Sequence, residues 1–192
     1  MAIALSRQTP EVPTLHVGNL RGEYLGVTAS GGGGARVGIR AAAGKGRTFY
    51  TVNLPGERDQ VQAVESANFE PRSTPWYAGA VSAKGRVFSP VQVATGQRQL
   101  MVSLSQPVYD SDGGVAGVFG ADMYLQRLAD VLRTQRISAR GAAFVVDEEG
   151  MLVASSAGDA LFGETGGRTQ RRTLADSRNP VIRAGFSELK KL

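Results

Sequence analysis

The sequence predicts an α+β fold in which antiparallel hairpins are combined with a few helices. Twenty-five of the 192 residues are glycine, which indicates many turns and therefore a chain rich in strands. A strand, an acidic turn that ends in glycine, a returning strand and a helix also occur twice, over 99–136 and again over 142–192. The composition, with 42% hydrophobic and 20% charged residues, is that of an ordinary globular protein.

The first part of the chain is predicted to form short strands around glycine-containing turns. We expect strands over 15–17, 23–27, 35–40 and 48–53, and a short helix over 59–67 with Val61 and Val64 on one side. The glycine runs at 31–34 and 38–46 lack the spacing and the following helix of a phosphate-binding loop, so we interpret them as hairpin loops. His16 is the only histidine, which favours a structural or surface role over metal binding or catalysis.

Residues 69–77 hold the only tryptophan of the chain, together with a tyrosine, an arginine and two prolines. Pro71 and Pro75 restrict their own backbone and that of the preceding residue, which predicts a stiff, extended segment. Such a segment suits the wall of a binding pocket. Trp76 and Tyr77 can equally be interpreted as large core residues, because both types are often buried.

The second part of the chain carries the two repeats. After an irregular turn and strand over 79–87 and a loop over 89–97, we expect strands over 99–109 and 115–123, with Leu100, Val102 and Leu104 on one face of the first. Asp122 is placed to cap a helix over 124–136. The second repeat predicts a hairpin of 142–146 and 151–154, a polar loop to 173 and a helix over 179–192. About fifty residues are too few to complete a sheet, so the chain looks truncated at its C-terminus.

Several functional classes are disfavoured by the residues themselves. The net charge is +5, but the basic residues are scattered, which argues against nucleic-acid binding. The absence of cysteine removes disulfides, thiol catalysis and thiolate metal sites. The acidic turn at 110–114 lacks the glutamate of a calcium loop, because Ala121 stands in its place. No histidine–cysteine pair or glycine-flanked serine elbow supports catalysis, so we predict no enzyme, no cofactor and no metal.

Three motifs in order give the chain a resemblance to the double Cache (dCache) sensor module. They are 71–77 (PRSTPWY), 105–122 (SQPVYDSDGGVAGVFGAD) followed by Leu125, and 144–155 (FVVDEEGMLVAS). The resemblance implies a PAS-like Cache fold, an antiparallel sheet flanked by helices. It also implies a membrane-distal, ligand-binding subdomain over 14–138 and the start of a second, truncated, membrane-proximal Cache subdomain over 139–192.

The resemblance further implies the extracytoplasmic (periplasmic) sensor of a bacterial inner-membrane receptor, of the chemoreceptor, histidine kinase or nucleotide cyclase type. A small molecule would bind in the distal pocket and signal to the membrane-anchored remainder, which is not in this chain. The ligand could bias signalling only through its different affinities for two conformations. The alternative is a ligand-free module that dimerises or docks a partner protein, and the resemblance also allows a homodimer.

The resemblance also implies which residues contact the ligand. Family members that resemble amino-acid sensors bind the ligand carboxylate with an arginine two residues before the tryptophan, and its amino group with an aspartate at position 122. Here the arginine position holds Thr74, which cannot replace a guanidinium fork. Arg72 could substitute only by pointing inward. We therefore expect a cationic or polar ligand other than a standard α-amino acid. The predicted site residues are Trp76, Tyr77, Asp122, Arg72, Thr74, Phe69, Val91 and Ser103.

Overall fold

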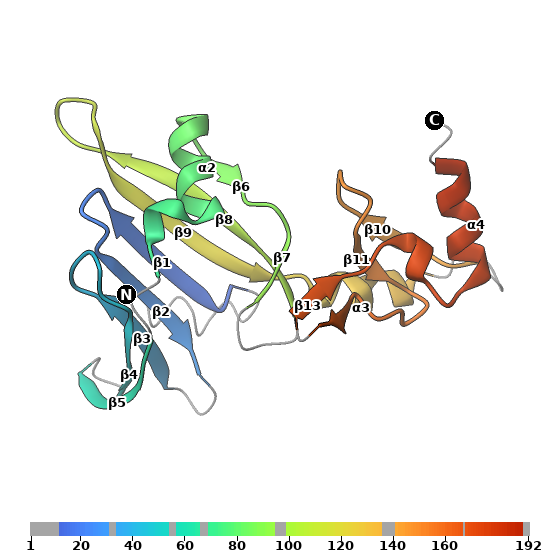
Figure 1. Cartoon of the computed structure of the whole chain (residues 1–192), viewed down its shortest axis with the longest axis horizontal. Helices are drawn as coiled ribbons and strands as arrows, with labels where there is room; N and C mark the ends of the chain where they lie inside the picture. The colour runs from blue at the N-terminus through green and yellow to red at the C-terminus, as the bar shows by residue number, and fades with distance from the viewer. Residues whose placement is uncertain are drawn as a thin grey trace. The chain divides into compact units, whose positions relative to one another are not determined.

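Figure 1 shows the computed structural model of the chain. The structure describes residues 12–30, 34–53, 57–65, 69–94, 99–135, 141–166 and 168–189. The chain divides into two compact units, Met1–Pro90 with Val102–Met123 (unit 1) and Val91–Met101 with Tyr124–Leu192 (unit 2). Each unit is described separately below. The subdomain boundary predicted between 138 and 139 stays a prediction.

A largely antiparallel sheet organises unit 1. Eight strands follow the order β5-β4-β3-β2-β1-β9-β8-β6, and β7 pairs with Leu100 and Met101 at the start of β8, a stretch that falls in unit 2. The predicted strands at 15–17, 23–27, 35–40, 48–53, 99–109 and 115–123 are confirmed within one or two residues. The strands are β1 (Thr14–Asn19), β2 (Tyr24–Ala29), β3 (Ala35–Arg40), β4 (Thr48–Val52), β5 (Arg58–Val64), β6 (Val87–Phe88), β7 (Gln92–Val93), β8 (Leu100–Tyr109) and β9 (Val115–Tyr124).

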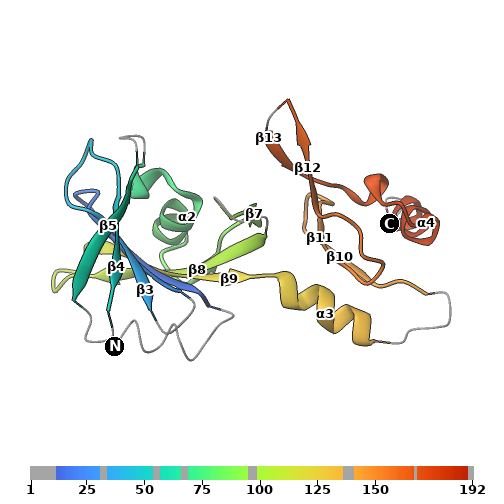
Figure 2. The ribbon, with the colours of Figure 1, turned by 90° about the horizontal axis from the view of Figure 1, so that it is seen from below.

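The segment that holds the tryptophan is helical, so the prediction of an extended segment over 69–77 is wrong. A 3-10 turn, η2 (Pro71–Ser73), leads into helix α2 (Pro75–Ala83). The backbone of Thr74 is extended, as the residue before a proline must be, and Pro75 then occupies the first helical position that proline favours. The two prolines therefore start helical turns. The helix lies against one face of the sheet (Figure 2).

Four other local predictions in the first 125 residues are wrong. Residues 58–64 form β5 instead of a helix, because β-branched Val61 and Val64 pair well with β4. Most of 79–87 belongs to α2, and the loop predicted over 89–97 contains β7. Asp122 lies within β9, and the helix that follows it is capped at Leu125. Of the glycine run at 31–34, residues 31–33 lie outside the described residues.

The face of β8 that carries its serines is more buried than the predicted apolar face. Ser103 and Ser105 are almost completely buried, whereas Val102 and Leu104 are half-buried. The reason is that Ser103 shares a face with Asp122 and donates a hydrogen bond to it. The hydroxyl of Ser103 can be buried there because it has this hydrogen-bond partner.

Unit 2 combines two hairpins with two helices. It contains α3 (Gln126–Thr134), β10 (Phe144–Val146), β11 (Leu152–Ser155), β12 (Phe162–Thr165), β13 (Arg168–Arg171), a 3-10 turn η3 (Leu174–Asp176) and α4 (Pro180–Leu189). The hairpin of β10 and β11 and both helices are confirmed. The polar loop predicted up to 173 is wrong, because β12 and β13 form a second hairpin there. Leu152, Leu174 and Ile182 form the buried core of this unit.

Candidate functional site

Trp76 and Tyr77 enter the core of unit 1 on the side of α2 that faces the sheet. Both are buried, with exposed fractions of 6% and 4%, and they cluster with Tyr24, Ala80 and Val118. The Trp76 ring lies 4.3 Å from the ring of His16 and 5.5 Å from that of Tyr77, measured between centroids. The structure thus places the two aromatic residues in the core, and ligand contact remains a prediction for them.

Asp122 lies beside this aromatic cluster with two polar neighbours. Ser103 Oγ donates a 2.7 Å hydrogen bond to Asp122 Oδ1, and His16 Nδ1 lies 3.6 Å from Asp122 Oδ2. His16 is only 4% exposed. Three of the strands, β1, β8 and β9, therefore bring a histidine, a serine and an aspartate together beneath α2. The sequence predicted Ser103 and Asp122 for this site but not His16.

Two glycines on the strands beside β1 make room for the buried rings of His16 and Tyr24. In the strand register His16 stands opposite Gly26 on β2 and opposite Gly120 on β9. A Cβ atom on Gly120 would lie 2.1 Å from His16 Nε2, and one on Gly26 would lie 2.3 Å from the hydroxyl of Tyr24. Side chains at either position would therefore displace the buried ring beside them.

Replacing Gly120 with alanine is expected to lower the free energy of unfolding by about 1–3 kcal/mol, because the added methyl overpacks the space held by His16. Urea unfolding followed by circular dichroism measures this. Gly79→Ala is the matched control, since a Cβ there meets only Val87 at an ordinary 3.7 Å and lies in a helix. Equal stability of the two variants would contradict the position of the His16 ring.

Burial dominates the ionisation of the site. It raises the pKa of the Asp122 carboxyl, against the opposing effects of His16 and Ser103. It also lowers the pKa of His16 and raises that of Tyr24 to about 12. A desolvated carboxylate gains more from a cation or a hydrogen-bond donor than an exposed one does. The site is therefore suited to a ligand that presents such a group to Asp122.

Arg47 places a cation against the aromatic rings of Phe69 and Tyr24. The guanidinium carbon of Arg47 is 3.8 Å from the centroid of the Phe69 ring and 5.4 Å from that of Tyr24. The rings of Phe69 and Tyr24 meet edge to face with centroids 5.0 Å apart. Sequence reasoning placed Phe69 at the site but missed Tyr24 and Arg47. The alternation of side chains along β1 and β2 could have placed Tyr24 on the same face of the sheet as His16. Nothing in the sequence indicated that Arg47 lies there.

Three predicted site residues lie elsewhere. Arg72 points outward, where it pairs with Glu70 at 2.8 Å and donates to the carbonyl of Leu20. The inward orientation that a contact between Arg72 and the ligand requires is not observed, because its guanidinium lies at the surface with the side chain 44% exposed. Thr74 donates its hydroxyl to the carbonyl of Pro71. Val91 belongs to unit 2, where its carbonyl accepts from Arg171.

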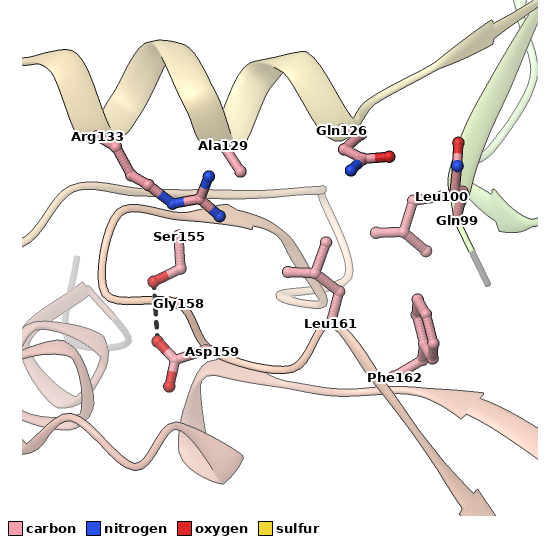
Figure 3. Close-up of a pocket in the computed structure, with 10 residues that line it drawn as sticks. All are labelled: Gln99, Leu100, Gln126, Ala129, Arg133, Ser155, Gly158, Asp159, Leu161 and Phe162. Carbon is pink, nitrogen blue, oxygen red and sulfur yellow. Dashed lines mark hydrogen bonds between the residues drawn. The ribbon is translucent and has the colours of Figure 1, made fainter.

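Unit 2 contains a separate cavity of about 350 Å³ (Figure 3). Side chains of α3 face the loop after β11 across it, and Ser155 donates a hydrogen bond to Asp159 at 2.8 Å. None of the predicted site residues lines this cavity. Its lining consists of Gln99, Leu100, Gln126, Ala129, Arg133, Ser155, Gly158, Asp159, Leu161 and Phe162.

Within the described residues, no helix has the length and hydropathy needed to span a membrane. Among these described residues, no group of three histidine, aspartate or glutamate side chains is arranged to hold a metal ion.

The chain is similar in sequence and in fold to known sensor proteins. Residues 43–130 match the family described as methyl-accepting chemotaxis protein-like, first PDC sensor domain. The methyl-accepting chemotaxis protein McpA of Pseudomonas putida is 33% identical over 98 residues, which is 50% of this chain and 15% of that protein. The methyl-accepting chemotaxis protein PctB of Pseudomonas aeruginosa is 26% identical over 122 residues, covering 64% of this chain and 18% of that protein.

The ligand-binding domain of the Campylobacter jejuni chemoreceptor Tlp3, solved in complex with L-norvaline, has a TM-score of 0.52 and 16% identity. That match covers 80% of this chain and 47% of the solved chain. The chain thus spans about half of the solved domain and less than a fifth of the curated receptors. The resemblance to a Cache sensor is confirmed: residues 43–130 match a PDC sensor domain of the methyl-accepting chemotaxis protein-like type, and the chain shares the fold of a chemoreceptor ligand-binding domain.

Proposed function

We propose that unit 1 is the extracytoplasmic sensor of a bacterial chemoreceptor and that it binds a small molecule beside Trp76 and Asp122. The observation that carries this proposal is the buried Asp122 carboxyl, held by Ser103 within 3.6 Å of His16, whose ring contacts Trp76. A desolvated carboxylate next to aromatic faces is a common way to bind a cationic or amino group. The match to the family of chemotaxis sensors supports the same role.

The nature of the ligand is proposed from the residues of the site. Tlp3 structures that share this fold are described in complex with isoleucine, L-valine or L-norvaline. Compact molecules with an amino group are therefore reasonable first probes. Thr74 stands where amino-acid-sensing relatives are expected to carry an arginine, so recognition of a carboxylate would need a different residue in this chain.

A ligand screen on the purified chain tests the proposal. Amines, organic acids, purines and amino acids are added, and the midpoint of thermal unfolding is recorded together with the fluorescence of Trp76, the only tryptophan. We expect at least one compound with an amino or cationic group to stabilise the chain and to change the fluorescence.

Asp122→Asn is expected to weaken binding of that compound by about 10-fold or more, because a neutral amide of the same shape loses the charge attraction. Gln126→Ala, in the cavity of unit 2, is the matched control and should leave the affinity unchanged. If Gln126→Ala weakened binding and Asp122→Asn did not, the ligand would bind in unit 2 and this assignment would be overturned.

The second candidate is a module that dimerises or docks a partner without a ligand. It would be favoured if no compound in the screen changes either signal while the chain self-associates in analytical ultracentrifugation. We also propose that the domain is not an enzyme and acts on the membrane-anchored remainder of its receptor. A histidine kinase or nucleotide cyclase output would replace the chemotaxis output in this proposal if the full-length gene encodes one.

A further inference from the structure

Arg47 is held against the aromatic side of the candidate site. Its guanidinium stacks on Phe69 with 3.8 Å between the guanidinium carbon and the ring centroid, and its side chain is 19% exposed. Stacking on an aromatic face leaves the edge of the guanidinium, with its N–H groups, available for hydrogen bonds. The position of this cation is thus set by packing.

Glu65 occupies that edge of Arg47. Arg47 Nε donates to Glu65 Oε2 at 2.7 Å and Arg47 Nη2 donates to Glu65 Oε1 at 2.8 Å. This is the two-pronged geometry with which arginine recognises carboxylates in general. These hydrogen bonds hold the pKa of Glu65 below its usual range, so the glutamate is ionised at neutral pH.

Arg47 and Asp122 belong to one group of side chains. The Tyr24 ring lies 5.4 Å from the Arg47 guanidinium, 6.0 Å from the His16 ring and 6.5 Å from the Trp76 ring. His16 in turn is next to Asp122. The charge of Arg47 is also close enough to act on the pKa of Asp122, although burial has the largest influence there. The aromatic group therefore has an anion at one side and a cation at the other.

We propose that Arg47 is the carboxylate-binding residue of this site and that Glu65 occupies it until the carboxylate of a ligand takes its place. The inference rests on the proposed function and narrows the ligand to compact molecules that carry a carboxylate together with an amino or cationic group. Such a zwitterion would face Arg47 with one end and Asp122 with the other. Standard amino acids then return as candidates, because the guanidinium comes from the start of β4 instead of position 74.

The surroundings of Glu65 make the exchange feasible. Glu65 follows β5, in which every residue is exposed, whereas Arg47 is packed against three aromatic rings, those of Tyr24, Phe49 and Phe69. The side chain of Glu65 is 31% exposed, so it can leave toward solvent. Replacing one carboxylate by another keeps both hydrogen bonds of the fork, so the exchange itself costs little. Contacts of the ligand with Trp76 and Asp122 would then decide whether its carboxylate displaces Glu65 from Arg47.

Fluorescence titrations of Trp76 with matched pairs of probes test this inference. The probes are L-norvaline and L-norvalinamide, and 4-aminobutanoate and its amide, which differ only in the presence of the carboxylate. In the unaltered chain we expect at least one acid to bind more tightly than its amide. Arg47→Gln should weaken binding of that acid by about 10- to 100-fold and leave the amide within about 2-fold. Arg47→Lys, which keeps the charge and much of the packing, should give an intermediate loss.

Glu65→Gln provides the second arm, because it removes the competing charge. We expect it to strengthen binding of the acid about 3- to 10-fold without changing the amide. Arg21→Gln and Glu57→Gln are the matched controls, since both residues are exposed and pair elsewhere. Circular dichroism establishes that each variant is folded.

The outcomes separate this inference from the proposed function. If acids bind equally to the unaltered chain and to Arg47→Gln, or if only amides and amines bind, Arg47 is not the carboxylate-binding residue, and the sensor proposal stands. Weaker binding of the acid by Glu65→Gln would show that Glu65 positions Arg47, which overturns the exchange. If no compound in this panel or in the wider screen affects Trp76, both proposals fail together.

Discussion

Replacing Trp76 with alanine is expected to lower the free energy of unfolding by about 3–5 kcal/mol and to abolish stabilisation by any ligand of the site. The indole is 6% exposed and packs on His16, Tyr77 and the backbone around Gly18, where a Cβ atom would lie only 3.3 Å from the ring. Its removal leaves a cavity that the surrounding strands cannot fill. Urea unfolding followed by circular dichroism at 222 nm measures the loss.

Trp76→Phe separates packing from ligand contact. It keeps an aromatic ring, so the free energy of unfolding should fall by less than half of the decrease seen in the alanine variant. Val61→Ala is a control for truncation as such, because Val61 is 57% exposed on β5 and should change stability by less than about 0.5 kcal/mol. A loss below about 1 kcal/mol in Trp76→Ala would contradict the observed burial of the indole.

Replacing Glu70 with glutamine is expected to lower the free energy of unfolding by about 2–3 kcal/mol at pH 7. Arg40 is only 2% exposed, and Glu70 is its carboxylate partner at 3.2 Å. The carbonyls of Gly22 and Lys45 also accept from Arg40 but carry no full charge. The substitution therefore leaves a buried cation without its counter-charge. Urea unfolding measures the loss, with Glu57→Gln as the exposed control.

The same substitution changes how stability depends on pH. Hydrogen bonds from Arg72, assisted by the charge of Arg40, lower the pKa of Glu70 from its usual 4.5 to about 2. A carboxyl group with a lowered pKa in the folded state stabilises the fold above its unfolded pKa, and this contribution is lost as the pH falls toward the folded value. The unaltered chain should therefore lose stability between about pH 4.5 and pH 2, and Glu70→Gln should lose less over that range. Parallel pH profiles would contradict the assignment.

Alternation of apolar residues and glycine turns predicted most strands correctly, because strands with one buried face leave a period of two in the sequence. The errors have local causes. Pro71 and Pro75 were interpreted as residues that keep the chain extended, but both occupy first positions of helical turns. Val61 and Val64 fit a helical spacing and a strand equally well, and pairing with β4 decides for the strand.

The site was predicted in part. Trp76 and Asp122 were proposed from the family pattern and Ser103 was proposed beside them, and the structure brings the three to one face of the sheet. His16 was set aside because a lone histidine rarely binds a metal, yet the register of β1 and β9 places it beside Asp122. Arg47 could not be found from the sequence, because its contact with Phe69 joins residues that are adjacent only in the folded chain.

The two outer strands of the sheet in unit 1 are poor templates for another strand. β6 has only two residues, and β5 pairs with β4 through an irregular register and begins with Arg58 and Asp59. Short edges, charges and irregular pairing all oppose strand addition from a second molecule. Within the described part of the chain, these features oppose the pairing of a second copy of the domain at the β6 edge and at the irregular start of β5.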